Sequence, residues 1–115
     1  MLQREWISTT IKTNQQANDM VQMFCRQNPV VGATDTETDG LHIILNKPFV
    51  VQFGWLHPTE PIGYTFALEL DKQPVLAMMV LHRWWQLAPT LAVHLGHNIK
   101  FDLHMLTNIG LPSVS

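Results

Sequence analysis

The sequence predicts an α/β domain built on one mixed β-sheet, and two observations lead to that prediction. Three β-rich segments, at residues 30–36, 49–55 and 63–70, are separated only by short connections, which is typical of an antiparallel meander. An apolar segment of helical length then precedes a further short β-rich segment at 91–95. A crossover of this kind lays the new strand parallel to an earlier one, so the sheet is expected to be mixed.

Local signals place the elements along the chain. The loop 41–48 and the turn 57–61 separate the three strands of the meander. Asn98 has the character of a helix N-cap, and Gly110 and Pro112 are typical of residues that follow a helix end. The expected elements are strands near 6–11, 30–36, 49–55, 63–70 and 91–95, and helices at about 14–27, 73–88 and 98–109.

The segment from Gln73 to Ala88 is apolar on every side of the expected helix. Helices of this kind are normally buried, so we expect a central core helix. A second interpretation is that one side of this helix is a surface that is normally covered by sequence missing from this chain. A third is that Trp84 and Trp85 form a stacking platform for nucleic acid.

The composition fits one small domain over residues 1–115. Charged residues make up 14% of the chain, below the roughly 25% of typical soluble domains, so some apolar surface is expected to need a cover. The net charge of −2 argues against a freestanding duplex binder and against a membrane-surface protein. The sequence has no apolar run of membrane-spanning length and no signal-peptide pattern, so a soluble, cytoplasmic protein is expected.

Cysteine and histidine contribute little to the functional prediction. The single cysteine, Cys25, excludes an intramolecular disulfide and a cysteine-rich zinc site. Its place on the helix at 14–27 predicts a small core residue. The spacing of His94, His97 and His104 does not put them on one face, so no histidine metal site is expected.

Asp35 and Glu37 stand at the end of the strand expected at 30–36. Alternate residues of a strand point to the same face, so the two carboxylates are expected side by side. Two such charges repel unless a cation lies between them, and a divalent ion with oxygen ligands fills that place. The alternative is a polar turn after a strand, because Asp and Gly are common in turns.

A second acidic position lies at the start of the helix expected at 98–109. Asn98, Phe101 and Asp102 are spaced i, i+3 and i+4, which places them on one stripe of that helix. The partial positive charge of the helix N-terminus favours the ionised form of Asp102. For this segment alone, the alternative is an ordinary solvated aspartate.

Together, Asp-Thr-Glu-Thr-Asp-Gly-Leu at 35–41 and Gly-His-Asn-Ile-Lys-Phe-Asp at 96–102 resemble the first two motifs of the DEDD superfamily of 3′-5′ exonucleases. They look most like the proofreading domain of DNA polymerase I (family A). The resemblance implies an RNase H-like fold, with helices on both faces of the sheet. It assigns catalysis and metal binding to Asp35, Glu37 and Asp102. The matching substrate-binding positions are Thr38, Leu41, Asn98 and Phe101.

The resemblance implies hydrolysis of the terminal phosphodiester at a single-stranded or frayed 3′ end of DNA, with two Mg²⁺ or Mn²⁺ ions as cofactors. The superfamily completes its site with a third motif, usually Tyr-x-x-x-Asp. Here the one tyrosine, Tyr64, lies between the first two motifs, and no acidic residue follows Asp102. The chain is therefore expected to be a C-terminally incomplete exonuclease domain. Its expected partner is the remaining part of the domain or a polymerase module.

The alternative belongs to a different class of protein. It is a non-catalytic remnant of the same fold, which acts as an interaction module and self-associates through its apolar surface. The two classes differ in whether their behaviour depends on divalent ions. Action on RNA stays open, because nothing in the sequence reports on a 2′-hydroxyl.

Overall fold

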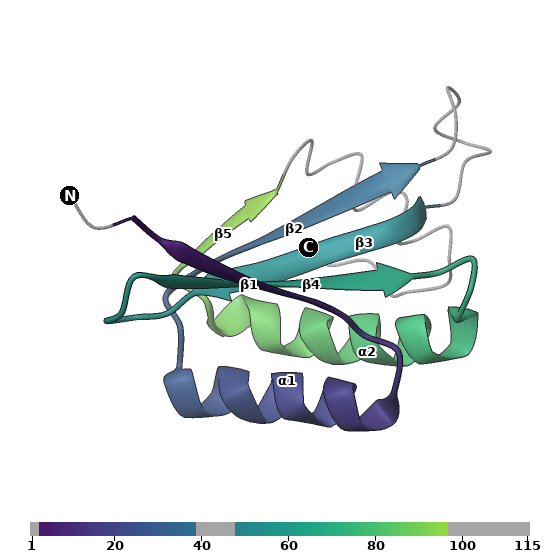
Figure 1. Cartoon of the computed structure of the whole chain (residues 1–115), viewed down its shortest axis with the longest axis horizontal. Helices are drawn as coiled ribbons and strands as arrows, with labels where there is room; N and C mark the ends of the chain where they lie inside the picture. Colours follow the sequence, from purple (N-terminus) through teal and green to yellow (C-terminus); the bar gives the residue numbers. More distant parts are fainter. Residues whose placement is uncertain (1–2, 39–47, 97–115) are drawn as a thin grey trace.

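The computed structural model describes residues 3–38 and 48–96, with the side chains of residues 36–38, 48 and 49 left out of the description. These residues form a five-stranded sheet with the strand order β1-β4-β3-β2-β5. Two helices lie against one face of the sheet (Figure 1). The elements are β1 (Glu5–Thr10), α1 (Asn14–Gln27), β2 (Val31–Thr38), β3 (Pro48–Leu56), β4 (Ile62–Glu69), α2 (Pro74–Leu87), the 3₁₀ turn η1 (Ala88–Thr90) and β5 (Val93–Gly96).

The sheet is mixed, as the sequence predicts. Strands β2, β3 and β4 form the antiparallel meander, and β5 returns after α2 to pair parallel with β2. The predicted bounds of these elements agree with the structure to within two residues. The sequence did not predict the partner of β1, which pairs parallel with β4 at the edge of the sheet.

Helix α1 begins and ends at residues with clear capping roles. The Thr13 hydroxyl accepts a hydrogen bond from the Gln16 backbone N–H at 3.1 Å, and the Gln16 side chain accepts one from the Thr13 N–H at 3.2 Å. This capping box satisfies backbone donors that have no partner within the helix. At the other end, Asn28 has a left-handed φ of 48° and donates its N–H to the Phe24 carbonyl. The chain then turns directly into β2.

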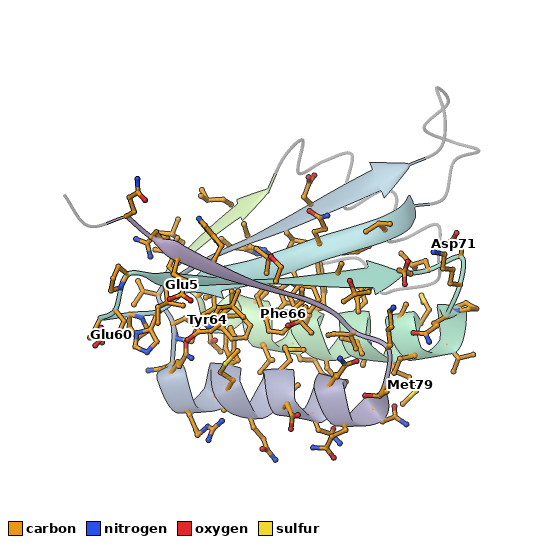
Figure 2. The ribbon with its side chains drawn as sticks, in the orientation of Figure 1. Glu5, Glu60, Tyr64, Phe66, Asp71 and Met79 are labelled. Atoms are coloured by element: carbon orange, nitrogen blue, oxygen red, sulfur yellow. The ribbon has the colours of Figure 1, made fainter. Side chains whose placement is uncertain are left out.

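The hydrophobic core lies between the two helices and the sheet. Its centre is aromatic: the Phe24 ring lies edge-on to Trp55 and Trp84, at centroid distances of 5.1 and 5.7 Å, and Phe53 stacks on Trp84 at 4.5 Å. Such pairs add to the free energy gained from burying apolar area. Figure 2 shows Phe66 in the same layer, between β4 and the helices.

Helix α2 is the core helix that the first interpretation predicts. Its inner face is buried, and Trp84 is fully buried, so the predicted stacking platform at Trp84 and Trp85 is wrong. Its outer face leaves Val75 and Met79 exposed. Cys25 is exposed as well, because it lies one residue beyond the buried Phe24, so the prediction of a core cysteine is wrong.

The other face of the sheet, here called the open face, has no described element over it (Figure 1). Helices were predicted on both faces of the sheet, and in the described part they cover one face. The helix predicted at 98–109 lies outside the described residues. Within the described ranges, no helix is long and apolar enough to cross a membrane.

Candidate functional site

Asp35 lies on β2, a strand with neighbours on both sides. Its backbone partner in β3 is Gln52, and its side chain is half-buried on the open face. The neighbouring Thr34 points the other way, into the core, where it is 4% exposed. This alternation is what a strand with one buried face produces, and it leaves the Asp35 carboxylate free of the core.

The second sequence motif begins beside the residue that precedes the first. Gly96, the first residue of the second motif, pairs with Thr34, which directly precedes Asp35. Strands β2 and β5 are parallel, so their carboxyl ends lie at the same edge of the sheet. Ligands of open α/β sheets commonly bind beyond this edge.

The remaining predicted site residues are described in part or not at all. Glu37 pairs with Val50 in β3, and Thr38 pairs with Pro48 after a shift in register, but their side chains are outside the description. The predicted positions Leu41, Asn98, Phe101 and Asp102 lie outside the described residues. That Asp102 converges on Asp35 and Glu37 stays a prediction.

The described side chains near Asp35 suit a hard cation. Asp35 and its neighbour Gln52 offer oxygen atoms, which are the ligands that Mg²⁺ and Mn²⁺ prefer, and the described residues that line the hollow beside them include no sulfur or imidazole ligand. Among the described side chains, which do not include that of Glu37, no three His, Cys, Asp or Glu residues gather into a group that could hold a metal ion.

A hydrogen-bonded chain of three side chains supports β2 from the core side, and the sequence analysis missed it. The fully buried Trp84 donates its indole N–H to the Thr34 hydroxyl at 2.8 Å, and that hydroxyl lies 2.7 Å from Nε2 of His94. These hydrogen bonds join α2, β2 and β5 at Thr34, one residue before Asp35. No local sequence signal marks it, because its members are fifty and sixty residues apart.

Burial lowers the pKa of His94 below its ordinary value of 6.5. The hydroxyl of Thr34 already accepts from Trp84, so it can donate its own hydrogen to a neutral His94. In the unfolded chain His94 takes up a proton as the pH falls below about 6.5, whereas in the folded protein it resists protonation. Stability from this residue is thus present above that pH and is lost as the pH falls below it.

We expect the free energy of unfolding to fall less steeply from pH 7 to pH 5 in His94→Gln than in the wild type. Glutamine cannot titrate but retains a hydrogen-bonding side chain beside Thr34. Urea denaturation at several pH values measures both slopes, and the other histidines contribute equally to the two proteins. Equal slopes would contradict the role given to His94.

A hollow of about 430 Å³, here called the trough, lies on the open face and reaches Asp35. Its floor is a row of small side chains in register across the sheet, from Ala33 in β2 through Gly54 in β3 to Thr65 in β4. Trp6 lines it on the β1 side and Leu95 on the β5 side. Asp35 is therefore accessible from an apolar hollow.

No protein-family model matches the sequence. No curated protein matches it significantly. Among the solved structures that share its fold are the catalytic core of RRP6 from Trypanosoma brucei, in a C496S mutant, and the EXO domain of Nibbler from Aedes aegypti.

The RRP6 structure is 16% identical to this chain, with a TM-score of 0.55 over 84% of the chain. The Nibbler structure is 13% identical, with a TM-score of 0.54 over 94%. The chain spans 24% of the first structure and 48% of the second. At these identities the similarity establishes the fold, which is an α/β fold compatible with the RNase H-like class and shared with an EXO domain.

Proposed function

We propose that this chain is part of a metal-dependent 3′-5′ exonuclease that hydrolyses the terminal phosphodiester of a DNA strand. The observation that carries the proposal is the pairing of Gly96 with Thr34, because it brings the start of the second acidic motif beside the first. The fold shared with an EXO domain supports the same reaction class. The assignment to DNA and to polymerase proofreading rests on the amino-acid sequences of the two motifs alone.

The proposal gives each motif residue a role. Asp35 would contact both metal ions, Glu37 would share one ion and contact the terminal sugar, and Asp102 would hold the other ion. Two Mg²⁺ or Mn²⁺ ions held by these carboxylates would supply an activated water and would stabilise the departing 3′ oxygen.

The other motif residues would position the substrate. Leu41 and Phe101 would pack against a nucleotide that has left the duplex, and Asn98 would orient its neighbours or a phosphate oxygen. Thr38 would lie beside the terminal nucleotide.

Mn²⁺ binding gives a direct test. We expect the chain to bind Mn²⁺ weakly, as measured by the loss of the free-ion signal in electron paramagnetic resonance, because part of the superfamily's ligand set is not in this sequence. The variants Asp35→Asn and Asp102→Asn should each reduce that binding. Asp19→Asn is the matched control, because Asp19 is an exposed carboxylate on α1. Equal binding by all four proteins would refute the proposal.

Turnover is measured separately with a 3′-labelled single strand and Mn²⁺. We expect slow release of single nucleotides at most, and none from Asp35→Asn. A matching RNA strand tests the substrate class, and faster shortening of RNA would overturn the assignment to DNA. Rapid shortening of DNA that Asp35→Asn abolishes would support the reaction class and overturn the expectation that the chain is catalytically incomplete.

A further inference from the structure

Strand β5 is short, and its place along β2 needs a side chain to fix it. The two strands pair through four residue pairs, from Val31 with Val93 to Thr34 with Gly96. The hydrogen bonds of a parallel pair are evenly spaced, so the backbone alone does not distinguish one register from the next. Side-chain contacts must therefore set the register of β5.

One side-chain contact joins the two strands on the side that faces the core. Thr34 faces the core, and Gly32, two residues earlier, faces the same way. Their partners in β5 are Gly96 and His94. Because glycine has no side chain, the side-chain contact among these four residues is that of His94 with Thr34. It runs diagonally across the pair, with 2.7 Å between Nε2 and the hydroxyl oxygen.

The imidazole of His94 also contacts helix α2. His94 is half-buried, whereas the other residues of β5 are exposed in the described structure. Its ring lies steeply inclined to those of Trp84 and Trp85, at centroid distances of 6.2 and 6.4 Å. Aromatic rings attract one another in this edge-to-face arrangement. His94 thus holds β5 both to the neighbouring strand and to the helix that covers this side of the sheet.

The hold matters most at the end of β5. The second motif begins at Gly96, two residues after His94. Leu91 is buried and holds the chain before β5, but no later side chain of this strand than His94 is buried in the described structure. A shift of β5 by one residue would turn His94 to the open face, and a shift of two would move Gly96 about 7 Å along β2. Either shift would change the position of the second motif relative to Asp35.

We propose that His94 is a positioning residue of the metal site, which acts through Thr34 to hold the second motif in register beside Asp35. In this role it contacts neither metal nor substrate. The role at the metal site rests on the proposed function, whereas the hold on β5 does not. The two parts are therefore measured separately.

Amide hydrogen exchange, followed by NMR without metal, tests the hold on β5. The Val93 N–H donates to the Val30 carbonyl at 3.0 Å. At the other edge of the sheet, the Ile11 N–H donates to the Ala67 carbonyl at the same distance, 3.0 Å. We expect His94→Leu to speed exchange at Val93 about tenfold or more relative to Ile11, because exchange there requires β5 to leave β2. Equal acceleration at the two amides would overturn the proposal.

Three further variants separate the contact with Thr34 from a general loss of stability. His94→Gln places an amide near the position of Nε2, so exchange at Val93 should stay within about threefold of the wild type. His94→Asn is polar as well, but its side chain is too short to reach Thr34, so it should behave like His94→Leu. Val21→Ala trims a partly buried side chain of α1 and should speed exchange at Val93 and Ile11 alike. Equal exchange in the glutamine and asparagine variants would contradict the proposal.

Mn²⁺ binding by the folded variants, measured by electron paramagnetic resonance, tests the role at the metal site. We expect His94→Leu and His94→Asn to weaken binding about tenfold or more, and His94→Gln and Val21→Ala to leave it within about twofold. In a Thr34→Val background, His94→Leu should cause little further loss, because the partner of the imidazole is already gone.

The two measurements distinguish the possible failures. A wild type that binds no Mn²⁺ would overturn the proposed function and with it the role of His94 at the metal site, while the exchange result on β5 would stand. A wild type and a His94→Leu variant that bind Mn²⁺ equally would overturn the positioning role and leave the proposed function in place.

Discussion

Gly54→Ala is expected to unfold the protein or to lower its free energy of unfolding by more than about 3 kcal/mol. A Cβ atom at this position would lie 1.9 Å from the carbonyl oxygen of Tyr64, in the neighbouring strand β4. The obstacle is backbone, so relief requires β3 and β4 to separate in the centre of the sheet. Urea denaturation followed by tryptophan fluorescence measures the loss, because Trp55 and Trp84 are buried against these strands.

Gly63→Ala is the control for this effect. Its Cβ would come as close as 2.3 Å to another atom, but that atom belongs to the ring of Trp6, an exposed side chain on the edge strand. The ring can turn away, so the expected cost is about 1 kcal/mol or less. If the two alanine variants are equally stable, the close approach of β3 and β4 at Gly54 is not as described.

Thr34→Val is expected to lower the free energy of unfolding by about 2–3 kcal/mol. Valine has nearly the shape of threonine, so the change removes the hydroxyl and little else. It leaves the indole N–H of Trp84 in the core without its acceptor, and Nε2 of His94 without its partner. Urea denaturation measures the effect.

Two comparisons assign that loss to the hydrogen bonds. Thr34→Ser retains the hydroxyl and should cost about 1 kcal/mol, the free energy of one lost methyl group. Trp84→Phe should cost less in the Thr34→Val background than in the wild type, because the unpaired donor is then removed as well. A serine variant as unstable as the valine variant would show that packing, not the hydroxyl, determines the effect.

Much of the fold could be predicted because its signals are local. The turn at 57–61 and the apolar crossover at 73–88 each specify an element from neighbours in the sequence. The strand pairing of the meander follows from its short connections. These features survive in the structure because tertiary packing reinforces them.

What could not be predicted depends on contacts between distant residues. The parallel pairing of β1 with β4 joins segments more than fifty residues apart, and no turn specifies it. Cys25 was assigned to the wrong side of α1, because the width of an apolar helix face cannot be read to within one residue. On α2, Met79 lies outside while Ala77 lies inside, for the same reason.

In the candidate site too, the features that depend on local sequence were predictable and those that depend on distant contacts were not. That Asp35 and Glu37 occupy alternate positions of one strand was predictable, but the expected position of Asp35 at the end of that strand was wrong, because β2 continues to Thr38. The support that Trp84 and His94 give to Thr34 was not, since only the folded chain brings these residues together. The predicted third carboxylate, Asp102, belongs to the part of the chain outside the described residues.

The pairing of β2 on both of its sides has a consequence for Asp35. From Gly32 to Thr34, the backbone of β2 is paired with β3 on one side and with β5 on the other. The residue that carries the carboxylate therefore directly follows a stretch of backbone that two neighbouring strands hold in place, so the position of Asp35 is set by the sheet before any ligand binds.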